Sequence, residues 1–370
     1  MSKFDLVEKL RINDILSAFI GKDSKNPDSI LRSSFLTRNL KPYYFNWGRN
    51  ALYYLFKNLK YQEIVFPSFT CPTLIQVAQK AGKKVILTEI DLETFNLDIN
   101  KIPSNTKCLV VVHTFGNPVD IKKIKDRFPK IYVIEDCAHA LFSRRKKAFA
   151  GNVGDSILFS LYKQVPNING SLLLSGINLK NNGGRESDFK YLKRLLFKTH
   201  GFHHHLLDLK RQKYLPKIEP FKLADNLPSK LALKLFSIGF KNLRSEIKKR
   251  RKICKWYFEE CKKSPYLTAQ KPEKNSSPSC YQFAVRLDPK LKRIREKLVT
   301  RLRKESIFID RLWYQAPICL EEHSSYVKNC PNAYLLANTV INLPIYSSYT
   351  RKDVKFLFKR LNSQILSIVK

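Results

Sequence analysis

The sequence predicts an α/β protein in which helices flank a mostly parallel sheet. Apolar runs typical of strands alternate with amphipathic segments over residues 51–163, as in strands joined by right-handed crossovers. The run at 108–113 is apolar almost throughout, as in a strand buried on both faces. A long basic helix predicted over 235–262 leads into a second section of strands and helices. The chain is therefore expected to form a large domain and a smaller C-terminal α/β domain.

The individual elements follow from local patterns. Residues 51–59 carry apolar side chains at helical spacing, and an amphipathic helix over 73–81 ends at Gly82. Residues 264–279 are rich in turn-forming residues and carry no periodic pattern. Further helices are expected over 120–128, over 290–304 and from Arg351, and strands over 63–66, 84–88, 130–135, 157–162, 280–287 and 307–309. The predicted division is an N-terminal segment (1–40), a large domain (41–240), and a linking helix with the small domain (241–370).

Composition sets limits on the class of protein. The 370 residues are 44% hydrophobic, which indicates a folded globular chain. The net charge of +37 comes from 68 Lys and Arg against 31 Asp and Glu, spread along the chain. It indicates a solvated basic surface first, and otherwise a nucleic acid, an anionic membrane or anionic substrates. No apolar stretch is long enough to cross a bilayer, and the N-terminus has no signal-peptide core, so we expect a cytoplasmic location.

The eight cysteines form no Cys-x-x-Cys pair and no Cys/His set with zinc-finger spacing. Several lie in apolar runs, where a free thiol behaves as a small hydrophobic group. The pattern predicts no metal centre and favours a reducing compartment.

An amine and a carboxylate follow two of the predicted buried strands. Asp136 ends the apolar run 131–134, and Lys163, 27 residues later, comes just after the run 157–162. Such sheets place their sites beyond the carboxyl ends of the strands, so the two groups should meet there. A lysine amine can condense with an aldehyde, and a buried aspartate can keep a heterocyclic nitrogen protonated. A pyridoxal phosphate enzyme needs this pair.

Two short segments could hold a phosphate. Gly48, Arg49 and Asn50 lie at the start of a predicted helix, where backbone N–H groups and the helix dipole favour an anion. Ser160 lies three residues before Lys163 and could donate its hydroxyl to the same phosphate. Each signal is weak alone, because a glycine before a helix is usually only a turn and a serine is usually at the surface.

Together these motifs resemble the DegT/DnrJ/EryC1/StrS family of sugar aminotransferases. The resemblance implies the type I fold of pyridoxal phosphate-dependent transferases, with a mostly parallel sheet of the seven-stranded type. It runs from about Gly48 to Arg360. The matching stretches are VFPSFT (65–70), DLETFNLD (91–98), VHTFGNP (112–118), EDCAHA (135–140), GD (154–155), FSLYK (159–163) and, more loosely, FAVRLD (283–288), PNA (331–333) and NLPIY (342–346).

The resemblance also implies roles for individual residues. Lys163 would hold the cofactor covalently and move the proton at the substrate carbon, with a pKa lowered by burial and a nearby cation. Asp136 would pair with the pyridinium nitrogen, and His139 would lie near the ring hydroxyl. Cys71 stands where many relatives have an aromatic residue that stacks on the ring. Asn226 is a candidate for the residue that reaches the phosphate of the partner subunit in a homodimer.

The predicted function is transfer of an amino group, with glutamate as the expected donor, to a nucleotide-linked keto-sugar for surface glycan synthesis. Dehydratases of the family carry histidine in place of the lysine, so Lys163 argues against that branch. Two alternatives stay open. One is a catalytically silent member that binds an anionic polymer or membrane, although no nucleic-acid module is visible. The other is a cysteine desulfurase or lyase that uses Cys319 or Cys330.

Overall fold

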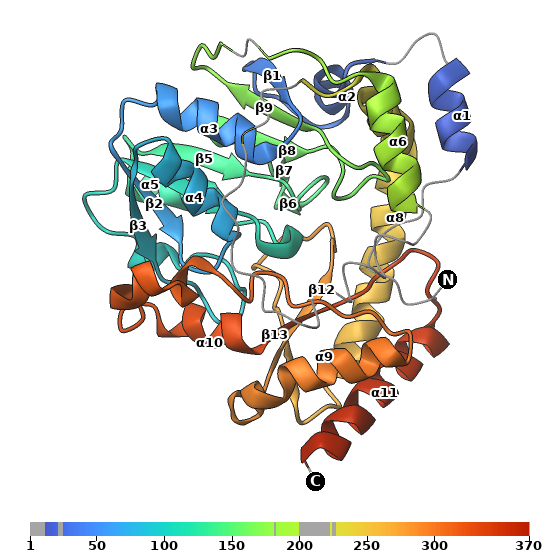
Figure 1. Cartoon of the computed structure of the whole chain (residues 1–370). Coiled ribbons are helices and arrows are strands. Elements are labelled where there is room, and N and C mark those ends of the chain that lie inside the picture. The colour runs from blue at the N-terminus through green and yellow to red at the C-terminus, as the bar shows by residue number, and fades with distance from the viewer. Residues whose placement is uncertain (1–11, 21–24, 181–182, 200–222, 224–226, 370) are drawn as a thin grey trace.

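A seven-stranded sheet forms the centre of the larger part of the molecule (Figure 1). The computed structural model describes residues 12–20, 25–180, 183–199, 223 and 227–369. Strand β9 runs antiparallel to both of its neighbours, and the other paired strands are parallel. In spatial order the strands are β1 (Lys41–Phe45), β9 (Ser171–Ser175), β8 (Ser156–Ser160), β5 (Tyr132–Asp136), β4 (Cys108–Val112), β2 (Glu63–Pro67) and β3 (Lys84–Thr88).

Helices cover both faces of this sheet, which explains why its strands are apolar almost throughout. In β4, Val110 and Val112 pack with α3 (Gly48–Asn58) and α4 (Pro72–Lys80), whereas the alternate residues of the strand pack with α5 (Ile121–Arg127). Beyond α5, the same face is covered by α2 (Pro27–Ser34) and the N-terminal half of α8 (Lys230–Cys261). Two further helices, α1 (Ile12–Ile20) and α6 (Asp188–Thr199), pack against α8.

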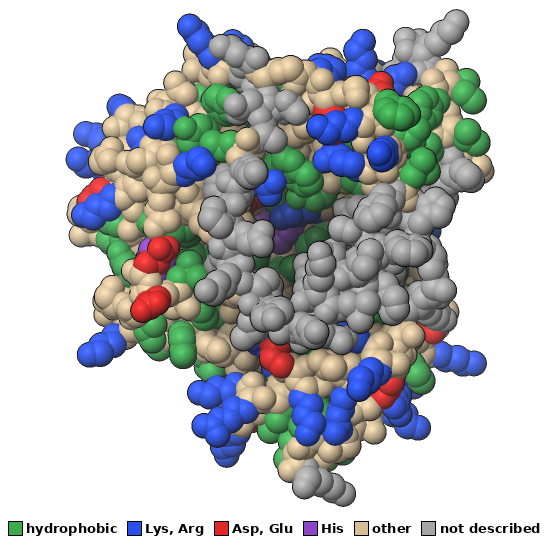
Figure 2. Space-filling view, viewed as in Figure 1, with side chains coloured by type: hydrophobic (Ala, Val, Ile, Leu, Met, Phe, Trp, Pro, Cys, Tyr) green, Lys and Arg blue, Asp and Glu red, His purple; other side chains and the backbone are tan. Residues whose placement is uncertain are grey.

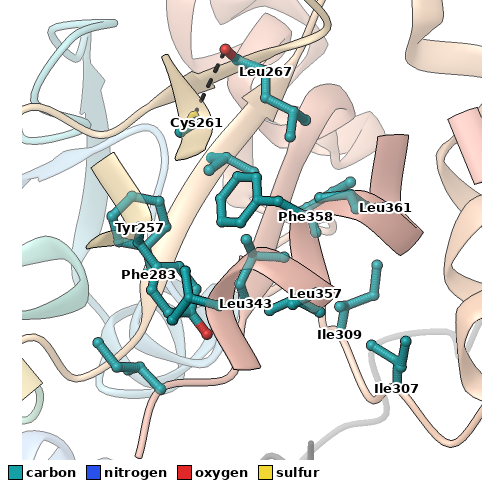
Figure 3. Close-up of a cluster of buried hydrophobic side chains, with 14 of the residues drawn as sticks. Tyr257, Cys261, Leu267, Phe283, Ile307, Ile309, Leu343, Leu357, Phe358 and Leu361 are labelled. Carbon is teal, nitrogen blue, oxygen red and sulfur yellow. Dashed lines mark hydrogen bonds between the residues drawn. The ribbon is translucent and has the colours of Figure 1, made fainter. Parts of the chain in front are cut away.

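The 32-residue helix α8 extends from the large sheet into a second core (Figure 1). That core lies on a three-stranded antiparallel sheet in the order β10 (Leu267–Ala269), β12 (Phe283–Leu287) and β13 (Val340–Leu343). Tyr257 of α8 meets Phe283 and Phe358 there (Figure 3). The remaining elements are α9 (Arg295–Lys304), α10 (Pro331–Thr339), α11 (Arg351–Val369) and the 3₁₀ turns η1 (Ile99–Lys101), η2 (Thr114–Gly116), η3 (Pro289–Ile294), η4 (Pro317–Cys319) and η5 (Glu321–Tyr326).

A third, small sheet joins the two parts of the chain. The hairpin β6 (Arg144–Arg145) and β7 (Ala148–Phe149) follows β5, and β6 pairs with β11 (Ser276–Ser277). Arg251 of α8 donates hydrogen bonds to the carbonyls of Phe142, Ser277 and Pro278 beside this sheet. The segment that follows β11 is thereby fixed against the large domain.

The predicted alternation of helices and strands is confirmed from α3 to β8. Residues 307–309 were predicted as a strand, which is wrong: this stretch has only isolated bridges, at Ile307 and at the neighbouring Asp310, which pairs with Asn342. The turn-rich stretch 264–279 contains β10 and β11, and the helix predicted over 290–304 begins as the 3₁₀ turn η3. The domain limits at 40 and 240 stay a prediction. Among the described helices, none is both long and apolar enough to cross a membrane.

Candidate active site

The carboxyl ends of β5 and β8 open into a pocket. These strands are parallel neighbours, and Asp136, the last residue of β5, lies opposite Leu158 of β8. Lys163 follows the end of β8 by three residues, and both Asp136 and Lys163 line the pocket. The pocket holds about 740 Å³ of space, part of it open to solvent. Figure 2 shows the hollow, with basic and histidine side chains at its floor.

Lys163 contacts His139 inside this pocket. The Nζ atom of Lys163 lies 3.1 Å from Nε2 of His139. Burial, and the charge of Lys163, hold the pKa of His139 well below its ordinary value, so the ring is neutral at neutral pH. A neutral imidazole ring can accept a hydrogen bond at Nε2 only if its own hydrogen is on Nδ1. The ammonium of Lys163 therefore donates to Nε2 of His139.

The expected lowering of the lysine pKa is wrong for the protein without bound ligand. Burial lowers the pKa of Lys163, but its acidic neighbours Tyr162, Tyr281, Asp136 and Cys71 raise it by more. The net direction is upward. The sequence could place Lys163 beyond a buried strand, but it could not show that acidic side chains from several segments converge there.

Asp136 is buried and presents its carboxyl group to the same pocket. Its Oδ1 accepts the N–H of Ala138 at 2.9 Å. Burial raises the pKa of Asp136, while the charge of Lys163 and the Ala138 hydrogen bond lower it by less. A buried carboxyl of this kind becomes fully ionised when a cationic partner comes within hydrogen-bonding distance. The pyridinium nitrogen of pyridoxal phosphate would be such a partner.

A second buried carboxylate, Glu135, lies behind the pocket wall. Its oxygens accept the N–H groups of Gly151 at 2.6 Å and Gly154 at 2.8 Å, and Oε1 lies 2.9 Å from Nε2 of His113. Nδ1 of His113 accepts the N–H of Val119 at 3.0 Å, so Nε2 carries the proton and donates it to Glu135. His113, Glu135 and Cys137 lie close enough to hold a metal ion. The His113 and Glu135 atoms that could bind it already take part in these hydrogen bonds.

The phosphate side of the pocket contains most of the predicted residues. Gly48 and Arg49 at the N-terminus of α3, and Ser160 at the end of β8, line the pocket. The Ser160 Oγ is buried and makes no hydrogen bond with the described part of the chain. A Cβ atom at Gly48 would lie 3.3 Å from Leu158, closer than most such contacts. Asn50 is buried but is not among the lining residues, which departs from the prediction.

Fit to the cofactor rests on these groups. A phosphate needs hydrogen-bond donors and positive potential, and the buried Ser160 hydroxyl, the start of the 11-residue helix α3 and Arg49 supply both. The ring end needs an amine and a carboxyl group, which Lys163 and Asp136 supply. The residues present therefore fit pyridoxal phosphate. Asn226, predicted to reach the partner subunit, lies outside the described residues.

Aromatic rings that the sequence did not reveal pack around His139, beside and within the pocket. Trp313 lines the pocket, and its ring stacks with His139 at a centroid distance of 5.5 Å and with Phe115 at 5.0 Å. Tyr281 stacks with His139 at 4.3 Å. Cys71 also lines the pocket, as predicted. Trp313 and Tyr281 lie in loops of the C-terminal part, where no periodic pattern or motif singles them out.

The cysteines proposed for desulfurase chemistry are poor nucleophiles here. Burial raises the pKa of Cys319 and of Cys330 to about 11, so both stay protonated at neutral pH. Neither lines the pocket described above. The geometry therefore gives the desulfurase reading no support.

Comparison with known proteins agrees with this geometry. The model of the DegT/DnrJ/EryC1/StrS aminotransferase family matches residues 45–362. The chain belongs to this family. Among curated members, it is 25% identical over 313 residues to dTDP-3-amino-3,6-dideoxy-alpha-D-galactopyranose transaminase of Aneurinibacillus thermoaerophilus, covering 81% of this chain and 78% of that protein. It is 30% identical over 106 residues to GDP-perosamine synthase of Escherichia coli O157:H7, covering 27% of this chain and 29% of the synthase.

Solved structures related to the DegT/DnrJ/EryC1/StrS family share the whole fold. PseC of Helicobacter pylori, an aminotransferase involved in pseudoaminic acid biosynthesis, has a TM-score of 0.74 at 18% identity and covers 98% of this chain and 99% of its own. GDP-4-keto-6-deoxy-D-mannose-3-dehydratase of E. coli, with bound hydrated PLP, has a TM-score of 0.70 at 19% identity, with coverages of 98% and 100%. At these identities the likeness shows the fold, which is the one predicted from the sequence.

Proposed function

We propose that this protein is a pyridoxal phosphate-dependent aminotransferase that acts on a nucleotide-linked keto-sugar, with an amino acid such as glutamate as the donor. The observation that carries the proposal is the meeting of Lys163, Asp136 and the N-terminus of α3 in one pocket. An amine, a buried carboxyl and a phosphate-binding turn in this arrangement match the aldehyde, ring nitrogen and phosphate of one cofactor. When bound, pyridoxal phosphate supplies an electron sink that stabilises negative charge at the substrate carbon.

Each residue has a distinct task in this proposal. Lys163 holds the cofactor aldehyde and, once released by the substrate, moves a proton to and from the reacting carbon through Nζ. Asp136 pairs with the ring nitrogen. His139 is neutral and has no hydrogen on Nε2, so it accepts a hydrogen bond from Lys163 and orients the amine. Ser160, the backbone at Gly48 and Arg49 bind the phosphate.

The substrate class rests on the relatives. The transaminase and the perosamine synthase are named for nucleotide-linked sugars, and PseC is described as taking part in pseudoaminic acid biosynthesis. The net charge of +37 suits a substrate that carries a diphosphate and a donor that carries two carboxylates. We infer a role in surface glycan synthesis, in the cytoplasm and as a homodimer. Size-exclusion chromatography with light scattering tests the dimer, and a mass of one chain would contradict it.

The direct test is absorbance spectroscopy. Purified protein supplied with pyridoxal phosphate should show a visible band, and one equivalent of glutamate should bleach it and yield 2-oxoglutarate. Adding a nucleotide-linked keto-sugar should then restore the band with formation of an amino-sugar. If the band returned but the product were a deoxygenated keto-sugar instead of an amino-sugar, the protein would be a dehydratase. Absence of any band, together with salt-dependent retention on an anionic polymer, would favour the silent family member.

Replacing Asp136 with asparagine should slow amino transfer by roughly 10²-fold or more, because a neutral amide cannot hold the ring nitrogen protonated. The cofactor should still bind, since Lys163 and the phosphate-binding residues are intact. The measurement is single-turnover bleaching by glutamate, with Asp126→Asn on α5 as the matched control. Equal rates for Asp136→Asn and the wild type would refute this role.

A further inference from the structure

The C-terminal part of the chain reaches into the candidate active site through residues 279–281. These residues follow β11 and precede β12, so they do not belong to the seven-stranded sheet. Ser279 is buried, and its Oγ donates to the backbone carbonyl of His139 at 2.6 Å. Its N–H donates to Oγ of Ser143 at 2.9 Å. The backbone of His139 and the side chain of Ser143, four residues later, are thereby tied to this segment.

This contact needs glycine at position 116. Gly116 has a φ of +91°, and a Cβ atom there would lie 2.1 Å from Oγ of Ser279 and 2.7 Å from the carbonyl oxygen of His139. No side chain fits such a space. The close approach of Ser279 to His139 is therefore built into the backbone of η2.

The ring of His139 is fixed separately by Tyr281. The two ring centroids are 4.3 Å apart and the planes differ by 15°, which is a close parallel stack. The side chain of His139 is 4% exposed, and Tyr281 is one of the groups that shield it. Because burial keeps the ring neutral, removing the tyrosine ring would admit water and favour the protonated imidazole.

We propose that Ser279 and Tyr281 are positioning residues that hold His139 with Nε2 directed at Lys163, so that the C-terminal part of the chain sets the geometry of the reactive amine. This proposal rests on the proposed function for its kinetic consequence. Its structural consequence concerns the cofactor-free protein alone. Ser279 and Tyr281 contact His139, and both are proposed to act on the amine of Lys163 only through His139.

Three variants separate ring, hydroxyl and backbone contacts. Tyr281→Leu removes the aromatic ring, Tyr281→Phe keeps it, and Ser279→Ala removes the hydrogen bond to His139. Tyr334→Leu on α10 serves as the matched control, because Tyr334 is 42% exposed and does not line the pocket. Thermal unfolding of each variant verifies that it folds.

The first measurement is nitrogen NMR of the histidine rings in cofactor-free protein between pH 5.5 and 8, with His139→Gln to identify the resonance. In the wild type, Tyr281→Phe and Tyr334→Leu, the His139 ring should stay neutral with the hydrogen on Nδ1. In Tyr281→Leu the pKa of the ring should rise because water enters, while the charge of Lys163 continues to lower it, so the protonated fraction at pH 5.5 should exceed that of the wild type. The second measurement is kcat and KM for the glutamate half-reaction. Tyr281→Leu should lower kcat by roughly 10- to 100-fold with a smaller change in KM.

The outcomes are distinguishable. If Tyr281→Leu matches Tyr281→Phe in both the titration and kcat, the positioning role is wrong. If it loses only thermal stability, the contact is structural and the proposal is equally overturned. A wild type that binds pyridoxal phosphate but transfers no amino group would defeat the proposed function, while the histidine titration would still decide whether Tyr281 controls His139. A smaller loss in kcat for Ser279→Ala, of about 3- to 10-fold, would support the same reading.

Discussion

Lys163→Ala should lose the visible absorbance of bound cofactor and lose amino transfer by at least about 10²–10⁴-fold, the share that proton transfer alone usually supplies. The loss should be larger still, because the same side chain is proposed to hold the cofactor covalently. Lys163 lines the pocket and contacts His139, and no other lysine of the described chain lines that pocket. The measurements are the absorbance spectrum after dialysis and the single-turnover rate with glutamate.

The matched control is Lys147→Ala, at an exposed position in the β6–β7 hairpin. It removes the same charge without touching the pocket and should keep both the band and the rate. A Lys163→Ala protein with an unchanged spectrum would remove the basis of the proposed function. Retention of the band in a Lys163→Arg variant would be equally damaging, because a guanidinium does not condense with the aldehyde at neutral pH.

Glu135→Ala should lower the free energy of unfolding by about 3–5 kcal/mol, as expected when one partner of a buried charged network is removed. Glu135 is 1% exposed and accepts from Gly151, Gly154 and His113, so its loss leaves three buried donors without an acceptor. Urea denaturation at pH 7 measures the effect. Glu93→Ala breaks an exposed pair with Lys271 and should cost no more than about 1 kcal/mol. If Glu135→Ala and Glu93→Ala lowered the free energy of unfolding equally, the buried network would contribute no more stability than an exposed ion pair.

The pH dependence of this effect has a definite sign. Burial raises the pKa of Glu135, but the hydrogen bonds that it accepts from His113, Gly151 and Gly154 help to lower it by more, so the net pKa is below the ordinary 4.5. A lowered folded-state pKa gives stability that is fully present above the unfolded value and is lost as the pH falls through the folded value. The gap in unfolding free energy between wild type and Glu135→Gln should therefore shrink below about pH 4.5. A gap that widens on acidification would contradict this assignment.

Much of the large domain was predictable because its strands carry their own signal. The five residues of β4 and of β8 are buried on both faces, and such strands are apolar almost throughout. The edge strand β1 contains Pro42 and alternates in burial, so it did not stand out, whereas β9 was not predicted although its pattern is that of β8. Ile307 and Ile309 are apolar because they fill the small-domain core, although no strand forms at residues 307–309. An apolar run records burial, and pairing depends on partners that lie elsewhere in the chain.

The residues of the candidate site also fall into those that the sequence predicted and those that it did not. Asp136, Ser160 and Lys163 were found because each lies at the end of an apolar strand, where parallel sheets gather their functional groups. Tyr281, which stacks on His139, and Trp313, which lines the pocket, were missed because they come from loops that are 118 and 150 residues beyond Lys163. Their positions depend on the packing of the two parts of the chain. The raised pKa of Lys163 in the ligand-free protein could not be predicted for the same reason, since Tyr281 contributes to it, and the lowering expected with bound cofactor stays a prediction.

The stack of Tyr281 on His139 has a practical consequence for anyone who expresses this chain in pieces. A truncated polypeptide that stops before β11 would retain Lys163 and Asp136 yet lack Tyr281 and Trp313, so a yellow colour in a purification column would report assembly of both halves. Ligand that binds only the folded state raises the unfolding midpoint in proportion to the logarithm of its concentration. Vitamin B6 added to the growth medium could thus improve the yield of intact material while leaving fragments unrescued.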